Sequence, residues 1–201
     1  MGIFSFKHRA PKEEVSDILY ETIFRVRADE MWEYARQRLV DRSLPLDSSK
    51  QHEIKLECFS LTAVFFSFSF QKECDYLGQD TIKALLDGFY SKLYEELNGL
   101  VEPRKVYELL GPRYDEYKSL MKEDLYWIEQ GTPILFLGTT EAFFSRVCPH
   151  HLRSPELVAF GPFLSEVHLS FCRALKTVKD FKIGSSDDCS WGHETSSKAK
   201  L

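Results

Sequence analysis

The sequence QHEIKLECFSLTAVFFSFSF, residues 51–70, decides the fold of this chain. Its apolar residues recur at alternating spacings of four and three, which places them on one face of an α-helix. The first row consists of Ile54, Cys58, Leu61, Phe65 and Phe68, and a second row beside it consists of Phe59, Ala63, Phe66 and Phe70. A helix that is apolar around most of its circumference has to be covered on several sides. We therefore predict a buried central helix at about 49–72.

A β-strand is the alternative for the end of this stretch. Phe66, Phe68 and Phe70 alternate with serines, and aromatic residues are common in strands. Strands are usually only about 5–6 residues long, however, and no turn signal interrupts residues 51–70. The length of the segment favours the helix.

Further helices joined by short connections are predicted along the rest of the chain. Pro11 opens the first one, and a second helix either begins near Asp29 or continues the first. We expect a break at Gly111–Pro112 and a kink or break at Gly161–Pro162, because glycine and proline interrupt helices. Residues 134–137 are predicted to begin a helix, with a short strand as the alternative.

These elements predict an all-α, single-domain bundle of roughly seven to eight helices around the central one. A length of 201 residues suits one domain. The bundle is expected to span 12–183, after an N-terminal arm at 1–11. A disordered tail is expected at 184–201, because that segment is rich in serine, aspartate and lysine.

The composition is that of a globular protein and disfavours nucleic acid as a partner. The chain has 26 basic and 31 acidic residues and a formal net charge of −5, whereas non-specific nucleic-acid binding requires an excess of basic groups. Its longest apolar run is shorter than the roughly 20 residues that cross a bilayer, so we predict no membrane span. The five cysteines are irregularly spaced; they favour a cytoplasmic protein with free thiols over a disulfide framework.

Sequence motifs of catalysis and cofactor binding are absent. The chain contains no glycine-rich phosphate loop and no GxSxG nucleophile motif, and Leu56 stands where an HExxH helix would have its second histidine. Glu53 and Glu57 lie one helical turn apart, and we predict a solvated or dipole-favoured pair rather than an acid–base couple. We therefore expect no catalytic residue and no cofactor.

A group of cysteines and histidines is the candidate metal site. It consists of Cys148, His150, His151, His168 and Cys172. His168 and Cys172 are four residues apart on one helical face, a spacing that can direct both side chains at one metal ion. The group lacks the paired CxxC spacing of specific zinc motifs, so we expect no metal. A metal-dependent enzyme that uses these five residues is the alternative.

Aromatic residues in the segment 107–127 are the candidates for ligand binding. The predicted ligand-binding residues are Tyr107, Tyr114, Tyr117 and Trp127. Side chains of this kind can line a pocket between helices, with the tyrosine hydroxyl groups orienting a ligand. Positions in the core or at its edge are the alternative, because tyrosine commonly lies half-buried.

These observations together predict a helical protein that acts by binding. We expect an adaptor, a chaperone-like factor or a regulatory subunit with a protein partner. A small-molecule-binding bundle is the second hypothesis. A homodimer is also considered, because any apolar helix face left over has to be covered.

Overall fold

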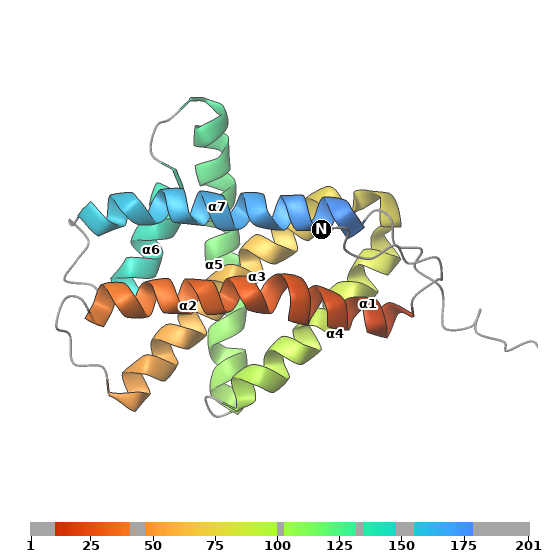
Figure 1. Cartoon of the computed structure of the whole chain (residues 1–201), viewed down its shortest axis with the longest axis horizontal. Coiled ribbons are helices and arrows are strands. Elements are labelled where there is room, and N and C mark those ends of the chain that lie inside the picture. Colours follow the sequence, from red (N-terminus) through yellow and green to blue (C-terminus); the bar gives the residue numbers. More distant parts are fainter. Residues whose placement is uncertain (1–10, 41–46, 100–102, 132–134, 148–154, 179–201) are drawn as a thin grey trace, which may run out of the picture.

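The computed structural model describes residues 11–40, 47–99, 103–131, 135–147 and 155–178. Within these ranges the chain is helical apart from short turns, and it contains no β-strand. The elements are α1 (Lys12–Ile18), a π-helical turn η1 (Leu19–Phe24), α2 (Arg25–Val40), α3 (Ser48–Glu73), a 3-10 turn η2 (Asp75–Leu77), α4 (Gln79–Asn98), α5 (Pro103–Glu129), α6 (Leu137–Val147) and α7 (Pro155–Val178). In Figure 1, α2 and α7 cross in front of α3. The predicted all-α bundle is confirmed.

Helix α3 is the buried centre of this bundle. It begins after Asp47, whose carboxylate accepts a hydrogen bond at 2.7 Å from the backbone N–H three residues later. Helices α2, α5, α6 and α7 all pack against it. Phe59, Phe65 and Phe66 are 0% exposed, and burying a side chain of this size stabilises a fold by about 1.5–3 kcal/mol. The predicted central helix at about 49–72 is confirmed.

Aromatic rings from several elements meet around α3. Phe66 of α3 stacks on Phe89 of α4, with ring centroids 4.4 Å apart, and meets Phe171 of α7 edge-on at 5.6 Å. Phe24 of η1 also meets Phe89 edge-on, at 4.9 Å. Stacked and edge-to-face pairs are the arrangements that aromatic rings prefer. Ring packing therefore joins helices that are distant in the sequence.

Elements α1, η1 and α2 form one continuous helix over residues 12–40, instead of two helices that meet near Asp29. The backbone is right-handed helical at both junctions, Ile18 and Arg25. A π-helical turn accommodates an extra residue without ending the helix. Its buried residues are Leu19, Tyr20 and Phe24.

The predicted break at Gly111–Pro112 is wrong, and Gly161–Pro162 does not end a helix either. Pro112 lies inside α5 and Pro162 lies inside α7. Both prolines are exposed, so water can hydrogen-bond the backbone carbonyl that each ring leaves without its helical N–H. With residues 12–40 counted as one helix, the described chain has six long helices rather than seven or eight.

Some predicted segments fall wholly or partly outside the described residues. These are Ile134, the arm at 1–11 apart from Pro11, the end of the bundle domain at 179–183 and the tail at 184–201. Residues 135–136 form a turn before α6, so the described part of 134–137 is not a strand. None of the described helices is both long and apolar enough to cross a lipid bilayer.

Helix α7 passes close to the turn before α6 at Gly161. A Cβ atom added to Gly161 would lie 2.0 Å from the carbonyl oxygen of Leu135. A Cβ atom added to Gly111 of α5 would have no atom within 4 Å apart from its neighbours along the same helix. Packing therefore requires glycine at the first position and not at the second.

We predict that Gly161→Ala lowers the free energy of unfolding by about 1–3 kcal/mol, because the methyl group overpacks the contact with Leu135. Gly111→Ala should raise it by about 0.5–1 kcal/mol, since alanine favours the helical backbone. Urea unfolding followed by circular dichroism measures both values. Equal stability of the two variants would contradict the close approach at Gly161.

Candidate functional site

A pocket of about 440 Å³ lies between α3, α4 and α5. Its apolar lining consists of Ala63, Ile82, Leu86, Leu93 and Leu110. Three tyrosines, Tyr90, Tyr94 and Tyr114, complete the wall, and we call this site the tyrosine pocket. Its volume lies in the range of about 300–1,000 Å³ that is typical of ligand sites.

Neighbouring side chains position two of these tyrosines. Tyr90 Oη lies 2.6 Å from Ser67 Oγ of α3, and the Tyr90 and Tyr114 rings meet edge-on with centroids 6.0 Å apart. Burial raises the pKa of the Tyr90 hydroxyl well above its usual value. The hydroxyl therefore stays protonated and keeps a hydrogen to donate.

Charged and amide side chains form the rim of the tyrosine pocket. Lys83 and Asp87, one turn apart on α4, form an exposed ion pair at 3.0 Å. Asp115 of α5 and two glutamines, Gln71 and Gln79, also border the pocket. An apolar interior within a polar rim is the anatomy of many recognition surfaces.

The predicted ligand-binding residues lie in different parts of the molecule. Tyr114 lines the tyrosine pocket. Tyr117 is fully buried and donates its hydroxyl to Glu57. Trp127 is 51% exposed near the C-terminal end of α5. The side chain of Tyr107 lies outside the described part of the structure.

Sequence reasoning did not identify Tyr90 and Tyr94 as pocket residues. They are four residues apart, which places both on one side of α4. The buried residues Leu93 and Leu97 lie on the adjoining side of the same helix. That spacing is the signal from which the two tyrosines can be recognised.

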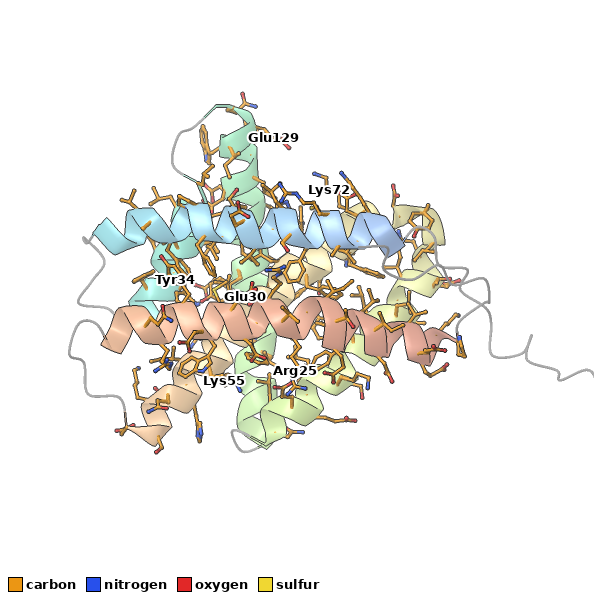
Figure 2. All side chains as sticks on the ribbon, viewed as in Figure 1. Arg25, Glu30, Tyr34, Lys55, Lys72 and Glu129 are labelled. Atoms are coloured by element: carbon orange, nitrogen blue, oxygen red, sulfur yellow. The ribbon has the colours of Figure 1, made fainter. Side chains whose placement is uncertain are left out.

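The C-terminal end of α5 projects beyond α7 (Figure 1), and Glu129 lies near its tip (Figure 2). Asp124 joins this end to α6 by accepting hydrogen bonds from the Gly138 and Thr139 backbone N–H groups at 2.9 and 2.8 Å. Trp127 contacts the ring of its exposed neighbour Tyr126 there. This part of α5 does not border the tyrosine pocket.

A second site surrounds the carboxylate of Glu57, on a different flank of α3. Tyr117 Oη of α5 donates to Glu57 Oε1 at 2.5 Å, and Arg146 Nη1 of α6 donates to the same oxygen at 3.0 Å. Arg113 Nε of α5 lies 3.3 Å from Glu57 Oε2. The Arg146 guanidinium lies over the Tyr117 ring, 5.0 Å from its centroid. One carboxylate thus joins three helices.

The prediction that Glu53 and Glu57 form a solvated pair is wrong for Glu57. Its side chain is only 9% exposed, whereas Glu53 is exposed and pairs with Lys50. Burial raises the pKa of the Glu57 carboxyl, and the Tyr117 hydrogen bond and the Arg113 charge oppose that increase. A carboxylate removed from water in this way needs its charged partners.

His168 lies buried between α7 and α3. Its Nδ1 is 3.0 Å from Ser69 Oγ, and its Nε2 is 3.8 Å from Cys172 Sγ. The rings of Phe65, Phe68 and Phe136 surround it. Burial and the nearby Lys72 charge lower the pKa of His168, which favours the neutral imidazole.

His168 and Cys172 therefore lie together, as their spacing predicts. The other three residues of the candidate metal site, Cys148, His150 and His151, lie outside the described residues. Across the described ranges, no group of three or more histidine, cysteine, aspartate or glutamate side chains is placed to hold a metal ion.

Comparisons with known proteins give no match to this chain among protein families, curated proteins or solved structures. Its sites are therefore interpreted from their own geometry.

We predict that Glu57→Gln lowers the free energy of unfolding by about 2–3 kcal/mol, because Arg113 and Arg146 lose the charge that compensates them. This value lies at or below the roughly 3–5 kcal/mol of fully buried pairs, since both arginines keep some exposure. The matched control is Glu53→Gln on the same helix, which should change stability by less than about 0.5 kcal/mol. Thermal and urea unfolding measure both variants, and equal effects would refute the role assigned to Glu57.

Proposed function

We propose that this chain is a binding protein, an adaptor or chaperone-like factor, that takes apolar side chains of a partner protein into the tyrosine pocket. The observation that carries the proposal is the composition of that pocket. Its apolar lining lies beside Tyr90, Tyr94 and Tyr114, within a rim that includes Lys83 and Asp87. Tyrosine is enriched at protein interfaces because one side chain offers both apolar contact and a hydrogen bond.

The energetics of burial support binding at this pocket. Transfer of a leucine or phenylalanine side chain from water to an apolar site contributes about 1.5–3 kcal/mol. The ion pair of Lys83 and Asp87 is exposed, so it stays hydrated and can orient a partner without a large desolvation penalty. Affinity in this proposal comes from the lining, and orientation comes from the rim.

An apolar small molecule with one hydrogen-bond acceptor is the second candidate ligand. The volume of about 440 Å³ suits such a molecule. The Tyr90 hydroxyl, 2.6 Å from Ser67 Oγ, is the group that would face its acceptor.

We place this binding activity in the cytoplasm. Cys58 and Cys172 carry free thiols, which is typical of a reducing compartment. The partner in this proposal is another protein. A homodimer formed through the same pocket is the alternative, and measurement of the oligomeric state distinguishes the two. The acidic net charge of −5 gives no support to nucleic acid as the partner.

The test places a bulky side chain at the border of the tyrosine pocket. Gly111 borders the pocket, and no atom apart from its neighbours along the same helix lies within 4 Å of where its Cβ would be. The Cβ atom of Gly111→Phe therefore meets no other element, and its ring is added at the border of the pocket. Ser119→Phe adds the same ring at an exposed position of α5 outside the tyrosine pocket, and it serves as the matched control.

We predict that a stoichiometric partner co-purifies with the wild-type chain and with Ser119→Phe, and that Gly111→Phe weakens its affinity at least tenfold by excluding its apolar side chains. Calorimetry with the purified partner measures the affinity, and light scattering shows whether the partner is a second copy. Native mass spectrometry of the same samples detects a retained small molecule, the outcome that favours the second candidate. Equal partner binding by Gly111→Phe would contradict the proposal, as would the recovery of neither a partner nor a ligand.

A further inference from the structure

Glu57 and its two arginine partners, Arg113 and Arg146, form one wall of a second cavity of about 280 Å³ between α3, α5 and α6. Its charged lining consists of Lys50, Glu53, Glu57, Arg113 and Arg146. These are three positive and two negative side chains, and Glu116, which pairs with Arg146 outside the lining, is a third carboxylate beside them. The remaining lining is aliphatic, so the cavity has a charged part and an apolar part.

The two arginines differ in how their donors are used. Arg146 donates from Nη1 to Glu57 and from Nη2 to Glu116, which lies outside the cavity. Both terminal nitrogens of Arg146 are therefore engaged. Arg113 contacts Glu57 through Nε, at 3.3 Å. Among the described residues, no hydrogen bond engages the two terminal nitrogens of Arg113. A guanidinium has five N–H donors in a planar fork that matches a carboxylate.

The contacts that join α3 to α5 and α6 at Glu57 do not require the guanidinium of Arg113. The hydrogen bond from Arg146 already connects Glu57 of α3 to α6, and the hydrogen bond from Tyr117 already connects it to α5. Arg113 adds a further positive charge whose side chain is 28% exposed and lines the cavity. A cationic fork of this kind at a cavity wall is suited to recognise an anion.

We propose that this cavity binds a small organic monocarboxylate. The ligand carboxylate accepts hydrogen bonds from the terminal nitrogens of Arg113, and the ammonium group of Lys50, which pairs with Glu53, lies at the same cavity. A single carboxylate is the anion that the planar donor fork of one guanidinium matches. The aliphatic part of the ligand packs against the apolar lining, which consists of Ile54, Leu56 and Val147. This site is separate from the tyrosine pocket and does not depend on the function proposed for it.

The experiment titrates the full-length 15N-labelled chain with sodium butyrate at constant ionic strength and follows its amide resonances by NMR. Butyramide is the matched neutral ligand, because it keeps the shape and loses the charge. We predict saturable shifts for butyrate at residues 50–57, 113 and 146–147, and none for butyramide. Inorganic phosphate is the third arm, which distinguishes a carboxylate site from a site for any anion.

Arg113→Gln should weaken butyrate binding at least tenfold, because it removes the guanidinium that donates to the ligand carboxylate. Arg25→Gln is the control: Arg25, labelled in Figure 2, has an exposed side chain that pairs with Glu21 and Glu96 away from this cavity. It should bind butyrate as the wild type does. If Arg113→Gln does not fold, Lys50→Gln replaces it, with an expected loss of several-fold.

Three results would overturn the proposal. The first is the absence of saturable butyrate shifts in the wild type. The second is an equal response to butyramide or to phosphate. The third is unchanged butyrate affinity in a folded Arg113→Gln variant, or in Lys50→Gln if that variant takes its place.

Discussion

The burial of the α3 aromatic rings is the interaction on which the rest of the structure depends. Phe65 and Phe66 are 0% exposed, and they are covered from different directions by Phe136, Phe89 and Phe171. Burial on all sides is compatible with the polar residues of α3 because several of them bond within the helix. Ser60 Oγ donates to the Leu56 carbonyl at 2.8 Å, and Thr62 Oγ1 donates to the Cys58 carbonyl at 2.7 Å.

Both candidate sites are built on flanks of this one helix. Ser60 and Ala63 contribute to the tyrosine pocket, whereas Ile54 and Glu57 contribute to the second cavity. A helix packed by α2, α5, α6 and α7 is a rigid support, which is what a preorganised binding site needs. The fold therefore explains why two unrelated kinds of lining, one with tyrosines and one with arginines, are held in place.

The sequence predicts the central helix because the spacing of its phenylalanines is a local signal. It does not predict that α5 continues through Pro112, because exposure of the proline to water depends on the finished packing. The burial of Glu57 escapes prediction for a similar reason. Its partners Tyr117 and Arg146 are 60 and 89 positions away in the chain. The aromatic residues of the segment 107–127 point to Tyr114, whereas Tyr90 and Tyr94 lie on α4, outside that segment.

Hydrogen exchange of the α3 amides tests most directly the claim that this helix is the covered centre of the fold. If it is, the amides of residues 58–70 exchange only through global unfolding, and their exchange free energy equals the unfolding free energy from urea denaturation. The projecting end of α5, near Tyr126 and Trp127, should exchange faster because local opening exposes it. Exchange at residues 58–70 that is as fast as at that end of α5 would contradict the account.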